Sequence, residues 1–294
     1  RKTNMNEAPS DNLLKVAGVQ MDIILMDLEA NLAAMEAHMV ETAAQGAQLT
    51  VFPECALTGY CFDSLEEALP YAESIPGPST DRLAKHCAKL GVFVIYGLLE
   101  QAGEDLFNAC VLVGPEGVIG SYRKIHLPFL GIDRFTTPGD RPFATQAAGP
   151  LNVGMNICYD GAFPESSRIM ALQGADLIVL PTNWPPGSES TADYVINARA
   201  MENAVYYMAV NRVGTERGFS FIGHSKICDT NGHTLANAAH TDPEILYAEL
   251  DLQRSRTKHL VRVPEKHEIN RFADRQPHWY AALSEPVQPD HQKE

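Results

Sequence analysis

One cysteine, one glutamate and one lysine stand where each could serve in nucleophilic catalysis. Cys158 follows an apolar run, 151–157, and precedes a helix that we expect to begin near Pro164. A thiol on such a strand-to-helix turn is firmly held, and the backbone N–H groups after it can stabilise an oxyanion. Its position alone leaves open the alternative of an ordinary buried cysteine.

Glu54 and Lys124 could supply the base and the cation for such a thiol. Glu54 lies directly after an apolar run and a proline, among apolar neighbours that would desolvate its carboxylate and raise its pKa. Lys124 ends another strand-like run, where its ammonium could stabilise the oxyanion of a tetrahedral intermediate. Taken singly, Glu54 could equally be a loop acid and Lys124 a surface lysine.

The elements that must hold these side chains alternate along the chain. Apolar or β-branched runs bounded by Gly, Pro, Asn or Asp predict strands over 13–20, 49–52, 92–99, 108–113, 117–123, 151–157, 177–180, 206–213, 221–228 and 245–250. Apolar residues at helical spacing predict helices over 28–45, 79–90, 164–173 and 192–204. Interleaved strands and helices indicate one layered α/β domain, in which the strand ends that carry the three residues converge on one edge.

The surroundings of the three residues resemble the nitrilase superfamily of carbon–nitrogen hydrolases, on the side of its amidases. The resemblance rests on Pro-Glu-x-x-x-x-Gly-Tyr around Glu54, Arg-Lys-x-His-Leu around Lys124, and Ile-Cys-Tyr-Asp-x-x-Phe-Pro-Glu-x-x-Arg around Cys158, in this order. It continues through 174–184, 198–203, 209–214 and 221–225, and covers roughly 13–282.

This resemblance implies a four-layer α-β-β-α sandwich that assembles as a homodimer or a larger homo-oligomer. It also implies a mechanism, in which Glu54 takes the thiol proton and Cys158 attacks an amide or nitrile carbon. Lys124 and the backbone N–H of Tyr159 would stabilise the oxyanion, and water activated by Glu54 would hydrolyse the thioester. Neither a metal nor an organic cofactor enters this chemistry.

One position departs from the family pattern. Many members carry a second glutamate on the loop after the lysine, where this chain has Asp133, which could replace it or be a plain turn acid. Residues close to the catalytic segments or to the end of the 177–180 strand are candidates for binding the substrate: Tyr60, Phe129, Asp133, Tyr159, Asn183 and Trp184.

The residues directly after Cys158 bear on the reaction. Nitrile-cleaving relatives tend to carry Trp-Glu at that point, whereas amide-cleaving branches resemble the Tyr159–Asp160 pair found here. We therefore expect a small-molecule amide or N-carbamoyl substrate. The alternatives are a nitrilase and a catalytically silent member kept for binding or as a scaffold.

Composition bounds the remaining possibilities. The net charge of −14 gives no electrostatic footprint for nucleic acid or anionic lipid, and no stretch is long and apolar enough to span a membrane. Six widely spaced cysteines without a C-x-x-C pair indicate reduced thiols, and with a polar N-terminus they favour the cytoplasm. The histidines show no metal-ligand spacing, and His126 is expected to support the loop after Lys124. We expect both ends, 1–12 and 283–294, to be loosely attached.

Overall fold

The computed structural model describes residues 13–286 of the 294-residue chain. Its larger compact unit ends at Arg256 and is built around two six-stranded sheets. The first sheet has the order β14 (Glu244–Asp251), β1 (Leu13–Gln20), β2 (Leu49–Val51), β3 (Phe93–Ala102), β4 (Asp105–Gly114) and β5 (Gly117–Arg123). The second has the order β13 (Thr234–Ala238), β12 (Ser225–Cys228), β9 (Tyr206–Asn211), β8 (Leu177–Thr182), β7 (Leu151–Met155) and β6 (Thr145–Ala148).

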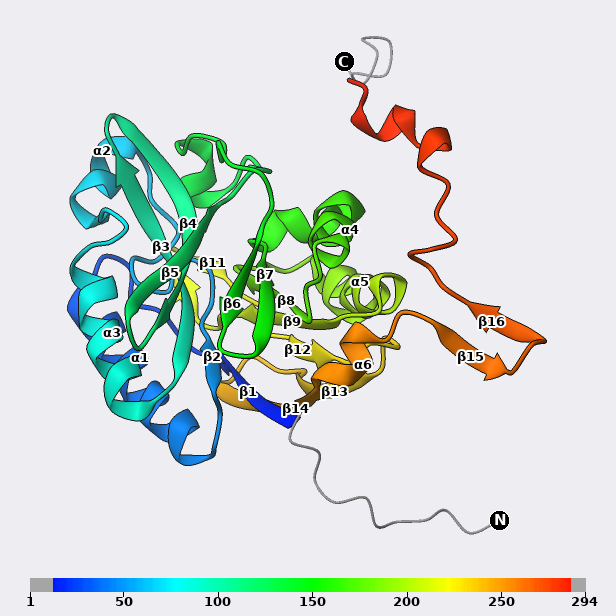
Figure 1. The fold of residues 1–294 in the computed structure, drawn as a ribbon. Helices are drawn as coiled ribbons and strands as arrows, with labels where there is room; N and C mark the ends of the chain where they lie inside the picture. The colour runs from blue at the N-terminus through cyan, green and yellow to red at the C-terminus, as the bar shows by residue number, and fades with distance from the viewer. Residues whose placement is uncertain (1–12, 287–294) are drawn as a thin grey trace. The chain divides into compact units, whose positions relative to one another are not determined.

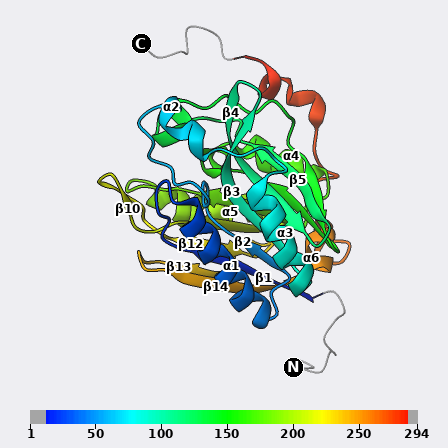
Figure 2. The same ribbon diagram turned by 90° about the vertical axis from the view of Figure 1, so that its left-hand side faces the viewer.

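Helices cover the outer face of each sheet (Figure 1; Figure 2). On the first sheet lie α1 (Leu28–Ala44) and α3 (Pro78–Leu90), and on the second lie α4 (Pro164–Leu172) and α5 (Ile196–Asn203). The inner faces meet where β1 contacts β9 and β12. The expected α-β-β-α sandwich is therefore confirmed.

The helices form where the apolar spacing and the end signals predicted them. In α1 the buried residues Leu32, Met35 and Met39 lie on one face, and the side chain of Asp27 accepts a hydrogen bond from the N–H of Ala30 at its start. The helix α3 begins at a proline and ends at Gly91, whose φ of 69° is the left-handed conformation that glycine adopts without strain.

Each sheet contains a parallel β-α-β-α-β unit, and the direction of its strands fixes where the predicted catalytic residues lie. In the first sheet β1, β2 and β3 are parallel, with α1 and α3 as crossovers, and in the second β7, β8 and β9 are parallel, with α4 and α5. Because β4 is antiparallel to β3 and β5 is antiparallel to β4, β5 runs in the same direction as β2 and β3. The carboxyl ends of β2 and β5 therefore lie at one edge.

Shorter elements complete the unit, and several were not predicted. They are α2 (Leu65–Ala68), the turns η1 (Leu69–Tyr71), η2 (Gly131–Arg134) and η3 (Cys158–Ala162), the π-helical turn η4 (Thr191–Val195), the hairpin of β10 (Thr215–Glu216) and β11 (Phe219–Ser220), and α6 (Leu252–Arg256). The strand predicted over 221–228 was wrong in its first half. There Gly223 and His224 have φ values of 67° and 58°, which no extended strand accommodates.

Residues 257–286 belong to a second, smaller unit. It contains an antiparallel hairpin of β15 (Leu260–Val263) and β16 (His267–Ile269), followed by the turns η5 (Pro277–Trp279) and η6 (Ala281–Ser284). The predicted loose attachment of 1–12 and of most of the C-terminal tail falls outside the described residues. The domain boundaries at 13 and 282 stay a prediction.

No helix within 13–286 is long and apolar enough to cross a membrane. All six cysteines are free thiols, and five of them are buried.

Candidate active site

The structure brings the three predicted catalytic residues together at one edge of the sandwich. Glu54 follows β2, Lys124 follows β5 and Cys158 follows β7. The Nζ of Lys124 donates a hydrogen bond of 2.7 Å to the Oε1 of Glu54. The charges of both side chains act on the pKa of the Cys158 thiol, so the sulfur lies within electrostatic reach of this buried ion pair.

Asp133 shares the ammonium of Lys124 with Glu54. The distance from Nζ of Lys124 to Oδ2 of Asp133 is 2.5 Å, and the three charged side chains are fully buried. Asp133 lies in the turn η2, where Tyr60 donates its phenolic O–H to the same Oδ2 over 2.8 Å. Asp133 thus lies within the charged cluster instead of being a solvated turn acid.

The turn that carries Cys158 is strained and tightly tied. Cys158 has a φ of 45°, which is uncommon for a residue with a side chain. Its own turn is closed by Asp160, whose carboxylate accepts from the N–H of Ile157 over 3.0 Å. From α5, Arg199 donates to the carbonyls of Gly161 and Ala162. Cys158 therefore sits on a rigid turn, and 8% of the residue is exposed.

Asp160 also joins the cysteine turn to the lysine loop. Tyr122 donates its O–H to Asp160 over 2.8 Å, and the backbone N–H of His126 donates to the other carboxylate oxygen over 3.2 Å. The His126 ring nitrogen lies 2.7 Å from that oxygen, and the ring stacks on Phe163 at a centroid distance of 3.7 Å. The prediction that His126 supports this loop is confirmed.

Burial and neighbouring charge set the protonation of the centre. Burial raises the pKa of Glu54, and the nearby Asp133 adds to the rise, against the opposing effect of Lys124. Burial opposes the charge of Lys124, but Glu54 and Asp133 outweigh it and hold its pKa well above the ordinary range. Burial, then the charge of Glu54, raises the pKa of the Cys158 thiol to about 12. The thiol is therefore neutral at rest and needs a base to react.

The predicted substrate-binding residues divide into two groups. Tyr60, Asn183 and Trp184 are buried, and the backbone N–H of Asn183 favours the thiolate of Cys158. The Asn183 side-chain amide is buried with no hydrogen-bond partner among the described residues. Tyr159 is 43% exposed, and Phe129 is 90% exposed. The buried residues and the exposed rings could therefore contact different parts of a substrate.

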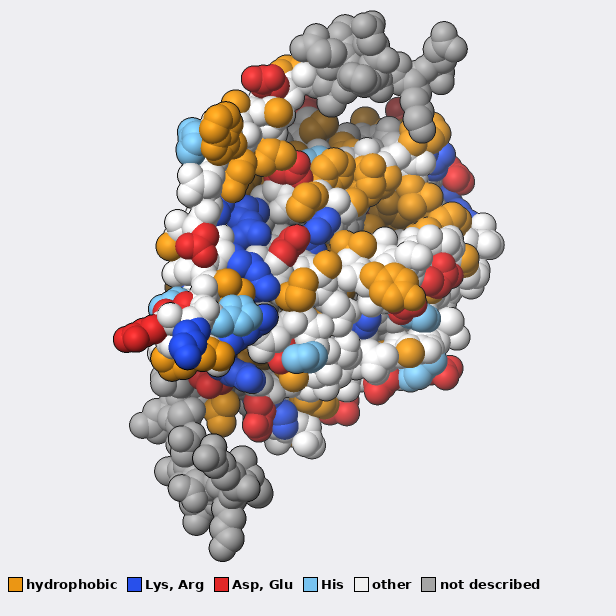
Figure 3. Space-filling model, turned by 90° about the vertical axis from the view of Figure 1, so that its right-hand side faces the viewer, with side chains coloured by type: hydrophobic (Ala, Val, Ile, Leu, Met, Phe, Trp, Pro, Cys, Tyr) orange, Lys and Arg blue, Asp and Glu red, His pale blue; other side chains and the backbone are white. Residues whose placement is uncertain are grey.

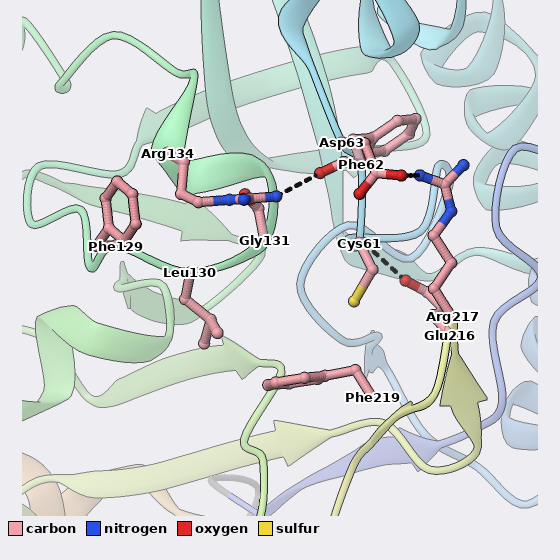
Figure 4. A pocket seen from close by; sticks show the side chains of 10 residues that line it. All are labelled: Cys61, Phe62, Asp63, Phe129, Leu130, Gly131, Arg134, Glu216, Arg217 and Phe219. Atoms are coloured by element: carbon pink, nitrogen blue, oxygen red, sulfur yellow. Dashed lines mark hydrogen bonds and ion pairs between the residues drawn. The ribbon is translucent and has the colours of Figure 1, made fainter.

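A pocket of about 280 Å³ adjoins the cluster (Figure 4). Its walls come from the segment after Tyr60, the loop around Asp133 and the β10–β11 hairpin, and they include Cys61, Leu130, Arg134 and Phe219. Arg134 donates to the carbonyl of Phe62 across it, and the Cys61 thiol points into it (Figure 4). The segments that carry Tyr60 and Asp133 therefore also shape this cavity.

Asn108 is a residue of the site that the sequence did not reveal. Asn108 is on β4, opposite Leu99 of β3, and its amide donates to both Glu54 and Asp133. One signal was present, because an asparagine inside the apolar run 106–113 must find buried partners. Nothing in the sequence identified those partners as the two carboxylates.

Comparison with known proteins places this geometry in a family. The family model described as carbon-nitrogen hydrolase matches residues 15–259. A protein named nitrilase from Pyrococcus abyssi is 40% identical, over 91% of this chain and 99% of that protein. A human omega-amidase is 33% identical, over 73% of this chain and 80% of that protein. The crystal structure of an amidase from Nesterenkonia sp. has the same fold, with a TM-score of 0.76 at 23% identity, covering 92% of this chain and 96% of that one.

Proposed function

The chain belongs to the carbon–nitrogen hydrolases of the nitrilase superfamily, and from that membership we propose that it cleaves a small amide or N-carbamoyl compound through a cysteine thioester. The observation that carries the proposal is the buried Lys124 ammonium, which Glu54 and Asp133 share and whose charge acts on the Cys158 thiol. A scaffold protein would gain nothing from burying these charges, which cost several kcal/mol each to desolvate.

The geometry supports a two-step reaction. In the first step the Oε2 of Glu54 accepts the thiol proton while the sulfur of Cys158 forms a bond to the carbonyl carbon, and Lys124 stabilises the oxyanion. The carbon–nitrogen bond then breaks, and Glu54 returns the proton to the nitrogen, which leaves as ammonia or an amine. In the second step Glu54 takes a proton from water, whose oxygen attacks the thioester carbon. The carbon–sulfur bond then breaks, Glu54 gives its proton to the sulfur of Cys158, and the acid is released.

An amide is favoured over a nitrile by the residues after the nucleophile. Tyr159 and Asp160 resemble the amide-cleaving branches, and the similarity to an omega-amidase points the same way. Nitrile hydrolysis is the second candidate, because the relative at 40% identity is named a nitrilase.

A second copy of the chain is the partner that we propose for the face formed by α4 and α5. Figure 3 shows hydrophobic side chains gathered on the side that carries these helices. The exposed large apolar residues of α4, of α5 and of the turn η4 that leads into α5 are Ile169, Leu172, Tyr194 and Met201. Exposed apolar side chains gathered on one side favour association, and the homodimer implied by the family resemblance would cover them. Six unpaired thiols fit a reducing compartment, which we propose is the cytoplasm.

The function is tested by ammonia release from a panel of aliphatic amides, ω-amides of dicarboxylates, N-carbamoyl compounds and nitriles. We expect turnover of an amide or carbamoyl compound, and its loss by at least about 10³-fold in Cys158→Ala and Glu54→Gln. Turnover confined to nitriles would replace the amide proposal with the nitrilase. Activity that survives in Cys158→Ala would contradict the thiol mechanism.

A further inference from the structure

Asn108 contacts both carboxyl groups of the site, yet no step of the proposed reaction uses it. The side chain is 1% exposed and belongs to β4. Its Nδ2 donates to the Oε1 of Glu54 over 2.7 Å and to the Oδ1 of Asp133 over 2.8 Å. Both N–H groups of the amide therefore donate to the two carboxylates.

The orientation of this amide is fixed by its surroundings. The thiol of Cys55 donates to the Oδ1 of Asn108 over 3.7 Å. A flipped amide would turn its carbonyl oxygen toward two carboxylates and would lose both hydrogen bonds. The backbone carbonyl of Asn108 also accepts from the backbone N–H of Lys124 over 2.8 Å, so Asn108 is hydrogen-bonded to both carboxylates and to the main chain of Lys124.

The four carboxylate oxygens of Glu54 and Asp133 differ in the number of hydrogen bonds that they accept. The Oε1 of Glu54 accepts from Lys124 and Asn108. The Oδ1 of Asp133 accepts from Asn108, and its Oδ2 accepts from Lys124 and Tyr60. The Oε2 of Glu54 is buried and has no partner among the described residues. It is the carboxylate oxygen of the cluster that remains open to a new proton.

We propose that Asn108 is a positioning residue that, with Lys124, occupies one oxygen of Glu54 and so leaves Oε2 as the atom that accepts the thiol proton. This inference rests on the proposed function, because it gives Glu54 the role of the base. Asn108 also supports the ionised form of that base, since a donor to a buried carboxylate stabilises its charge. Removing the donor should therefore leave Glu54 protonated up to a higher pH.

The test follows the rate of Cys158 alkylation by iodoacetamide against pH, read by mass spectrometry of the Cys158 peptide. Asn108→Leu keeps the size of the side chain and removes both donors, and Asn108→Asp keeps the shape and replaces the amide with a third carboxyl group. We expect both to move the midpoint of the acidic limb upward by about one pH unit or more. Asn31→Leu is the matched control, since it removes a buried amide that donates to the carbonyls of Ile24 and Leu57. It should lower stability and leave the midpoint in place.

A midpoint that stays at the wild-type pH in a folded Asn108→Leu or Asn108→Asp protein would overturn the positioning role. Failure of both variants to fold, judged by near-ultraviolet circular dichroism, would assign Asn108 to stability alone and overturn it as well. Alkylation needs no amide substrate, so the two proposals fail separately. A wild-type protein that hydrolyses nothing in the panel counts against the amidase function, whereas an unshifted midpoint counts against Asn108.

Discussion

At the scale of single residues, the chemistry depends on how burial and charge compete at Glu54. A lone carboxyl group in this position would stay protonated, because water cannot reach it to stabilise the charge. The ammonium of Lys124, 2.7 Å away, partly offsets that cost. The result is a carboxylate whose pKa is raised by burial and restrained by its partner, which suits a base working near neutral pH.

This balance predicts how activity depends on pH. Protonation removes the base, so kcat/KM should fall as pH falls through the raised pKa of Glu54. The acidic limb should then lie above the value of about 4.3 that an unperturbed glutamate has. The profile is measured with the substrate found in the panel, between pH 4 and 8, with stability followed in parallel. Full activity persisting down to pH 4 in a folded protein would contradict a buried Glu54 base.

At the scale of elements, the close approach of β3 to the segment after β2 sets the position of Glu54. Gly97 of β3 lies against that segment, and a Cβ atom there would come 2.3 Å from the N of Cys55 and 2.7 Å from the Cα of Glu54. Those atoms are backbone, which cannot move aside cheaply. Only a glycine allows β3 and the base to lie this close.

Gly97→Ala should therefore displace Glu54 and lower kcat by at least about tenfold, because misplacing a reacting group by an ångström is costly. The matched control is Gly103→Ala in the turn between β3 and β4. Gly103 has a φ of 66° and nothing near its Cβ position, so that change should cost stability of about 1 kcal/mol and leave kcat as it was. Equal kcat values in the two variants would show that the glycine does not position the base.

The helices and strands differ in how well the sequence predicted them. Helices such as α1 and α3 carry both the apolar spacing and the end signals, and the structure has them within a residue or two. The four-layer fold and the nearness of the three predicted residues also followed from the motifs. Short edge elements such as β6 and β13 were missed, because four or five residues with a weak apolar pattern carry little signal.

The contacts between residues of the site were harder to predict than the residues that form it. Asp133 could be named as a candidate, but whether it is a turn acid or a partner of Lys124 depends on where η2 packs. Asn108 joins Glu54 from 54 positions away in the chain, through strand pairing that no local pattern specifies. Long-range hydrogen bonds of this kind are set by the assembled sheets.

At the scale of the larger unit, the site is assembled from both sheets. Glu54, Asn108 and Lys124 belong to the first sheet or its connections, and Cys158 follows a strand of the second. Buried Arg212, which follows β9, pairs with Glu216, and Glu216 accepts from the N–H groups of Tyr60 and Cys61. The relative position of base and nucleophile therefore depends on the packing of one sheet on the other.

The proposed self-association belongs to this scale too. Replacing Ile169 or Leu172 with glutamate would place a charge in the apolar face of α4 and α5, which is costly to bury in an interface. We expect Ile169→Glu to convert the dimer to a monomer in light scattering at micromolar concentration. Leu235→Glu is the control, because Leu235 is 44% exposed on β13, an edge strand of the second sheet. A mass that does not change in Ile169→Glu would exclude this face as the interface.

The central claim is that Cys158 becomes acylated with Glu54 as its base, and capture of the intermediate tests it most directly. The protein is mixed with its amide substrate, quenched in acid during the first turnovers and analysed by mass spectrometry. The account predicts an added mass equal to the acyl group on the Cys158 peptide, absent in Cys158→Ala and strongly reduced in Glu54→Gln. Turnover without an adduct on Cys158, or an adduct on another of the six cysteines, would contradict it.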